Sequence, residues 1–144
     1  MIMFTSEKAA EIMNNQQPID IIIVERVKEN LAKKGVVLAQ SSDLDRMLIS
    51  RGQEAVTYSD GTMVMHTKVS ASGFYEELLH YGQIKNGRAI YGNRQNELIL
   101  EIEAKEKLIK NQKAYKITDY EVEILKNVLN EYKTEWGTLQ KGGA

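Results

Sequence analysis

An Asp-Gly turn signal between two strand-like runs, followed at once by a helical segment, limits the folds open to this chain. Ala55–Tyr58 and Thr62–Thr67 contain the β-branched and aromatic residues typical of strands, and Ser59–Gly61 separates them. Asp-Gly at such a position predicts a β-hairpin. The next segment has a helical pattern and begins at a capping serine, Ser70 or Ser72. We therefore expect a small sheet, built on this hairpin, to pack on that helix.

The other segments add helices and one short strand. Val36–Ala39, an apolar run after a glycine, predicts a buried strand. Gly82–Asn96 is rich in Gly, Asn and Arg and predicts an irregular loop. The β-branched run Ile21–Val24 leaves a strand open as an alternative to a helix after Pro18. The predicted helices are 7–13, 18–35, 43–50, 97–112 and a last one that ends near Trp136. This order of elements is typical of an α+β fold.

The last helix has an explicit start signal. Thr118 and Glu121 are spaced as a capping box, and Ile117 and Val122 stand at the positions of a hydrophobic staple. After this helix, residues 137–144 contain several glycines and predict a flexible tail. No internal repeat or second domain is visible, so we expect residues 1–144 to form a single domain.

Composition limits the classes of partner and the cellular location that we expect for this chain. The chain has 144 residues, of which 42% are apolar and 27% charged, as in globular proteins. Its net charge is −1 and it has no basic run, so we do not expect nucleic acid as the main partner. No apolar run approaches the roughly 20 residues needed to span a membrane, and the start of the chain lacks a signal-peptide pattern. We therefore expect no membrane partner and a cytosolic location.

A helical run that ends in histidine predicts a metal site. The chain has no cysteine, so a metal would be bound by His, Glu, Asp or carbonyl oxygen. Glu76 and His80 are four residues apart and share one face of the predicted helix. The familiar zinc helix is His-Glu-x-x-His, with the central Glu as general base. Here Glu76 replaces the first His, and Glu77 occupies the position of the general base.

A third ligand is expected on the next helix. Glu101 projects inside the apolar arc of that helix and Glu103 projects outside it. A carboxylate that points into a core needs a cationic partner, and a metal ion would provide one. Lys105 also falls inside the arc, so a lysine partner for Glu101 is an alternative to a metal. Glu103 remains a second candidate for the third ligand. The residues that define the arc are Leu98, Ile102, Ala104, Leu108 and Ile109.

His66 is a further candidate ligand. It lies near the end of the second hairpin strand, on the opposite face from Met63 and Met65. It could complete the site in place of the missing histidine, or it could be an ordinary strand histidine.

Three runs carry a family resemblance: Tyr58–Gly61, Ser70–His80 and Glu101–Leu108. With them, the stretch 57–131 resembles the zincin-like metallopeptidase toxin domain found at the end of phage minor capsid proteins. In the wider zincin class a second helix supplies a Glu, often with a small residue three positions later, and Glu101 with Ala104 is similar to that pattern. The resemblance implies zinc, peptidase activity and a toxin or host-directed role of phage or prophage origin. The sequence departs from the family at Glu76.

These observations support more than one function. The first hypothesis is a zinc-dependent hydrolase that cleaves a peptide or protein substrate, with Glu77 as the general base. The hairpin strand that ends near His66 would then offer backbone groups to the extended substrate. The second is a catalytically degenerate zincin-like module that binds a host or phage protein. The third is a structural protein associated with the virion. The sequence does not indicate the substrate, the target or the oligomeric state.

Overall fold

The computed structural model describes residues 2–5 and 18–142 of the chain. The strands are β1 (Ile2–Thr5), β2 (Leu38–Ala39), β3 (Ala55–Tyr58) and β4 (Met63–Met65). The helices are α2 (Ile21–Ala32), α3 (Ser42–Ser50), α4 (Ala71–Lys85), α5 (Arg94–Lys110), α6 (Gln112–Tyr115) and α7 (Asp119–Gly142). The fold is thus mixed α+β and mostly helical, as expected, while the helix predicted at 7–13 lies outside the described residues.

The hairpin predicted from the Asp-Gly turn is confirmed and forms the centre of the sheet. β3 and β4 pair antiparallel, with Thr57 opposite Met63. Gly61 has a φ of 91°, a backbone conformation that favours glycine. β2 pairs parallel with β4, and β1 pairs antiparallel with β3, so the strand order is β1-β3-β4-β2. Since β4 has a neighbour on both sides, the expectation that it offers backbone groups to a substrate strand is wrong.

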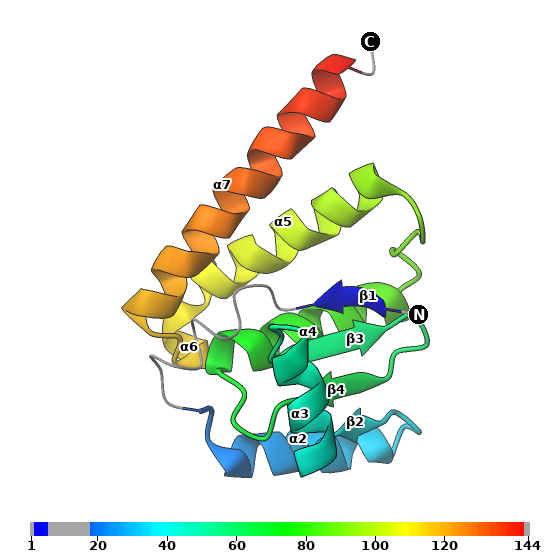
Figure 1. Ribbon diagram of the computed structural model, residues 1–144, viewed down its shortest axis with the longest axis vertical. Helices are drawn as coiled ribbons and strands as arrows, with labels where there is room; N and C mark the ends of the chain where they lie inside the picture. The colour runs from blue at the N-terminus through cyan, green and yellow to red at the C-terminus, as the bar shows by residue number, and fades with distance from the viewer. Residues whose placement is uncertain (1, 6–17, 143–144) are drawn as a thin grey trace.

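Side chains along the strands point alternately to the two faces of the sheet, and each face packs against its own apolar layer. Val56 and Val64 pack with Leu48 of α3 on one face. Met63 and Met65 point to the other face, where a larger core includes residues of α2 and α4. In Figure 1 α3 lies in front of the sheet and α4 behind it. α4 is therefore covered by the sheet, as the sequence predicted for the segment after the hairpin.

The starts of α4 and α7 follow the predicted capping residues, whereas α2 begins at Ile21 and α5 at Arg94 instead of at residues 18 and 97. α2 is capped by Asp20, so a helix is confirmed here and the alternative strand is wrong. Ser70 caps α4 by accepting a hydrogen bond from the backbone N–H of Gly73. The predicted loop over 82–96 is confirmed for 86–93 and wrong at both ends, because α4 continues to Lys85 and α5 begins at Arg94. Asn93 caps α5, so its polar character marks a helix start rather than a long loop.

α5 and α7 lie alongside each other on the β1 side of the sheet (Figure 1). The capping box at the start of α7 is confirmed, because Thr118 Oγ1 accepts from the Glu121 N–H at 3.2 Å and Glu121 Oε2 accepts from the Thr118 N–H at 2.8 Å. α7 runs to Gly142, so the predicted end near Trp136 and the flexible tail over 137–142 are wrong. Leu139 packs with Trp136 against the α5/α7 core, which extends the helix. No helix within residues 18–142 combines the length and apolarity needed to cross a bilayer.

Candidate metal centre

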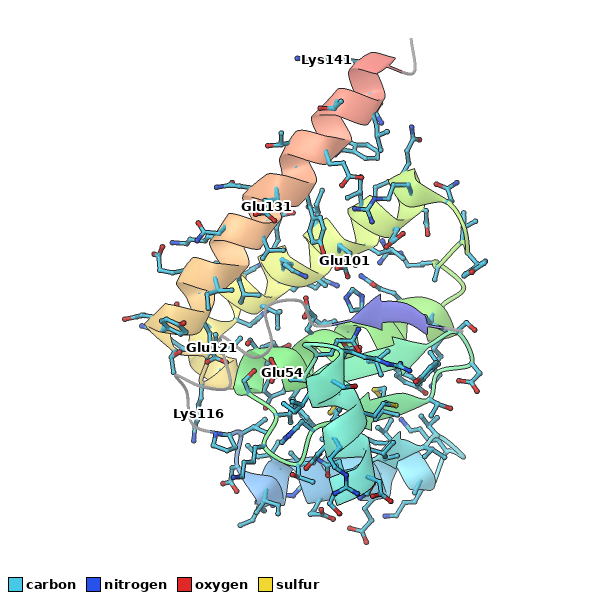
Figure 2. The ribbon with its side chains drawn as sticks, in the orientation of Figure 1. Glu54, Glu101, Lys116, Glu121, Glu131 and Lys141 are labelled. Atoms are coloured by element: carbon cyan, nitrogen blue, oxygen red, sulfur yellow. The ribbon has the colours of Figure 1, made fainter. Side chains whose placement is uncertain are left out.

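α4 and α5 bring three potential ligands together in the interior. Glu76 and His80 come from one face of α4, and Glu101 comes from the facing side of α5. One ligand atom from each residue lies within 4.8 Å of the other two, and all three residues are buried. Figure 2 shows Glu101 on the side of α5 that faces the sheet and α4. The helical phase predicted for Glu101 is confirmed.

His80 contacts a partner through each ring nitrogen. Nε2 lies 2.5 Å from Glu101 Oε1, an ion-pair contact. Nδ1 lies 2.8 Å from Oε1 of Gln83. Burial acts to lower the pKa of His80, but the charge and hydrogen bond of Glu101, together with the charges of Glu77 and Glu76, outweigh burial and raise the pKa to about 9. Without a metal, His80 is therefore an imidazolium that pairs with Glu101.

Lys105 of α5 is the cationic alternative that the sequence left open. Its ammonium contacts Glu76 Oε1 and lies 3.5 Å from Glu101 Oε2. It also lies 5.3 Å from the centroid of the Tyr132 ring, a cation–π contact. Burial acts to lower the pKa of Lys105, but the two carboxylates outweigh burial and raise it. Lys105 thus neutralises the same carboxylates that would bind a metal.

Glu77 points to the sheet rather than to α5. Its side chain is fully buried, and the hydroxyl of Thr57 on β3 donates a hydrogen bond to Oε2. Burial raises the pKa of Glu77 to about 8, although the charge of His80 acts to lower it. A carboxyl group that titrates near neutral pH suits proton transfer. Sequence analysis missed Thr57, because its contact with Glu77 depends on how β3 packs on α4.

The other two candidate ligands lie away from this group. Glu103 faces outward on α5, where Arg88 donates to both of its carboxylate oxygens at 2.6 Å. His66 directly follows β4 and points to the side of the sheet that α3 covers, with Nε2 3.8 Å from Asp45 Oδ2. Strand alternation therefore sends His66 to the opposite side of the sheet from α4. The structure brings together Glu76, His80 and Glu101 and does not add Glu103 or His66.

A second pair of buried glutamates anchors the start of α4 (Figure 2). Glu54 accepts from the backbone N–H of Ser70 at 2.7 Å and from its hydroxyl at 2.9 Å. Glu121 accepts from the backbone N–H of Ser72 at 3.1 Å and from its hydroxyl at 2.9 Å. Burial raises the pKa of Glu54 to about 7, and the hydrogen bonds from Ser70 only partly offset this. These carboxylates hold the helix that carries the centre.

The donor set of the centre fits zinc. Two carboxylates and one imidazole are common zinc ligands, and three protein ligands leave a position open for water or substrate. A cavity of about 650 Å³ lies beside α5 and α7, and another of about 370 Å³ lies beside the starts of α2 and α4. Neither of these two cavities is lined by Glu76, His80 or Glu101, so each lies apart from the buried centre.

Comparison of the chain with protein-family models, with curated proteins and with solved structures finds no match.

Proposed function

We propose that the chain is a metal-dependent hydrolase, with zinc bound by Glu76, His80 and Glu101. The observation that carries the proposal is the grouping of these three ligand atoms within 4.8 Å, on two helices that the sheet and α7 hold in place. When bound, zinc supplies Lewis-acid chemistry that polarises a carbonyl group and activates water. The fold proposed around this centre is zincin-like.

In this proposal Glu77 takes the proton from the attacking water. Glu76 and His80 would hold the metal, and Glu77, which follows Glu76 on α4, would act as the base without being a ligand. The hydrogen bond from Thr57 fixes its carboxyl group. A pKa of about 8 lets Glu77 exchange a proton near neutral pH. His80, Glu76 and Glu101 would hold the metal, and the burial of all three keeps bulk water from the centre.

The proposed substrate is a peptide or protein, and the proposed role is that of a toxin or host-directed effector of phage or prophage origin. Both follow from the resemblance of Ser70–His80 to the zincin-like toxin domain. A cytosolic or virion-associated location belongs to the same proposal.

The second candidate is a binding module with a metal-free ionic core. One observation favours it: the ammonium of Lys105 already contacts Glu76 and lies 3.5 Å from Glu101. His80 and Lys105 together then balance the two carboxylates. In this case the centre stabilises the fold, and a surface elsewhere on the chain binds a host or phage protein or attaches the chain to a virion.

Metal content and one conservative variant separate the two candidates. For a hydrolase, we expect up to one zinc ion per chain by elemental analysis of protein purified without chelator. Glu77→Gln should keep the metal and lower cleavage of an unstructured peptide mixture by about 10²–10⁴-fold, because glutamine cannot accept the proton. His80→Ala should lose the metal as well.

Glu106→Gln is the matched control, since it makes the same change at an exposed position on the outer side of α5. It should leave metal content and cleavage unchanged. The toxicity of each variant when expressed in a host cell provides a second readout. Absence of metal, or full toxicity of the Glu77→Gln variant, would contradict the hydrolase and favour the binding module.

A further inference from the structure

Gln83 lies one turn after His80 on α4 and connects the centre to the surface. Its side chain is buried, and Oε1 lies 2.8 Å from Nδ1 of His80. Its Nε2 donates to the backbone carbonyl of Leu100 at 3.1 Å and reaches Glu103 Oε1 at 3.5 Å. Gln83 therefore touches α4 at one end of its amide and α5 at the other.

The partners of the amide determine which way it points. A backbone carbonyl can only accept a hydrogen bond, so the carbonyl of Leu100 requires the NH₂ group of Gln83. Arg88 pairs with Glu103 and holds the pKa of that carboxyl below its usual range, so Glu103 is also an acceptor. The amide oxygen of Gln83 must then face His80. Because an amide oxygen can only accept, Nδ1 of His80 must be the donor.

We propose that Gln83 is a positioning residue that fixes the hydrogen of His80 on Nδ1 and makes Nε2 the ring atom that binds a cation. Only the binding of a cation in this proposal rests on the proposed function. The position of the hydrogen on Nδ1 follows from the contacts of Gln83. In the other tautomer, lone pairs of Nδ1 and Oε1 would meet at 2.8 Å, which is repulsive. Nε2 faces Glu101, within the ligand group. Partners of this kind tune metal affinity by orienting the ligand.

The second histidine of the chain is an internal control. His66 accepts a hydrogen bond at Nδ1 from the backbone N–H of Lys68 at 3.0 Å. When neutral, His66 therefore carries its hydrogen on Nε2. The chain has two histidines, and the structure assigns opposite nitrogens to their hydrogens.

Long-range ¹H–¹⁵N correlation spectra of the full chain with ¹⁵N-labelled histidine show which ring nitrogens of His80 and His66 carry hydrogen. We expect the Nδ1 of His80 to keep its hydrogen in the metal-free protein above pH 9, where the ring becomes neutral, and also after addition of zinc. The neutral His66 ring should show hydrogen on Nε2. An unprotonated Nδ1 in His80 under either condition would overturn the proposal. Because the spectrum of the neutral metal-free ring decides this point, it stands or falls separately from zinc binding.

Two substitutions then test the effect on the metal. Gln83→Leu removes the acceptor and should weaken zinc binding about 10–100-fold in competition with a chelator. Gln83→Glu keeps an acceptor for Nδ1–H and should retain most of the affinity, even though a carboxylate beside Glu103 costs more stability than leucine. Equal losses in both variants, or none in Gln83→Leu, would overturn the positioning role. A parent protein that takes no zinc would contradict the proposed function, and the ring spectrum would still decide the role of Gln83.

Discussion

Helix α4 meets buried glutamates at its first turn and again along its middle, and the two groups have different partners. At the first turn, Glu54 and Glu121 accept hydrogen bonds from the backbone and hydroxyl groups of Ser70 and Ser72. All these donors are neutral and fixed. They also include the free N–H groups of a helix start, which carry partial positive charge.

Along the middle of α4, the partners are groups that carry charge. Glu76 contacts the ammonium of Lys105, and Glu101 contacts both Lys105 and the ring of His80. A buried carboxylate that depends on a cation is costly once that cation is removed. Another cation, such as zinc, can take its place. The same residue type therefore serves as a fixed cap at one point of α4 and as a potential ligand at another.

The largest expected effect comes from removing a cation from the second group, the carboxylates along the middle of α4. Lys105→Met keeps the length of the side chain and removes its charge, which leaves Glu76 and Glu101 short of a counter-ion. We expect the metal-free protein to lose about 3–5 kcal/mol of unfolding free energy, measured by urea unfolding in the presence of a chelator. Zinc should restore stability to this variant more than to the parent, because it replaces the missing cation.

The matched control for Lys105 lies two residues further along α5. Lys107 is half exposed and lies 3.4 Å from Glu103, so Lys107→Met should change the unfolding free energy by at most about 1 kcal/mol. If zinc fails to stabilise the Lys105→Met variant, the centre is an ionic core and not a metal site.

The local parts of both groups could be predicted from the sequence. Glu76 and His80 share a helix face, and the apolar arc of α5 correctly placed Glu101 inside and Glu103 outside. The capping box of Thr118 and Glu121 was visible for the same reason, since its residues are three positions apart. Patterns of this kind depend on the geometry of a single helix.

The contacts that could not be predicted join residues far apart in the sequence, or lie where the local composition indicated a loop instead of a helix. Glu121 meets Ser72 across 49 positions and Glu54 meets Ser70 across 16, and no periodic pattern joins such residues. Gln83 is only three positions after His80, so a continued helix would have revealed it. The glycines and asparagines of 82–96 instead predicted a loop that ended the helix too early.

A smaller effect concerns Glu54 and pH. Burial raises its pKa in the folded protein from 4.5 to about 7, so the folded state binds the proton more tightly than the unfolded state. This group therefore contributes full stability below pH 4.5 and loses it as the pH rises to about 7. The loss is about 3 kcal/mol at most, at about 1.4 kcal/mol per pKa unit.

Glu54→Gln should remove this pH dependence. Glutamine keeps an acceptor for the Ser70 N–H and carries no charge. We expect the variant to match the parent near pH 4.5 and to exceed it at pH 8 in urea unfolding, with Glu29→Gln on the exposed face of α2 as the control for loss of one charge. The difference between variant and parent isolates Glu54, since other titrating groups are present in both. A variant that loses stability equally at both pH values would show that the carboxylate itself is needed as the cap.

The smallest expected effect tests how closely the carboxyl group of Glu54 packs against the first turn of α4. A Cβ at Gly73 would lie 2.5 Å from the carboxyl carbon of Glu54 and 2.6 Å from Oε2, so one of them must move. Glu54 cannot move without giving up its hydrogen bonds to Ser70. Overpacking of this kind costs about 1–3 kcal/mol, which exceeds the roughly 1 kcal/mol that alanine gains over glycine inside a helix. We therefore expect Gly73→Ala to lower the unfolding free energy.

Gly82 provides the matched control on the same helix. A Cβ at Gly82 meets nothing within 4 Å, so Gly82→Ala should raise the unfolding free energy by up to about 1 kcal/mol through helix propensity alone. The two substitutions should thus differ in sign when measured by thermal or urea unfolding under the same conditions. A gain in stability from both would mean that Glu54 has room to move, and the start of α4 would then be a looser structure than its hydrogen bonds indicate. Opposite signs would show that the cap is a fixed part of the fold, which the cation-dependent group further along α4 relies on for its position.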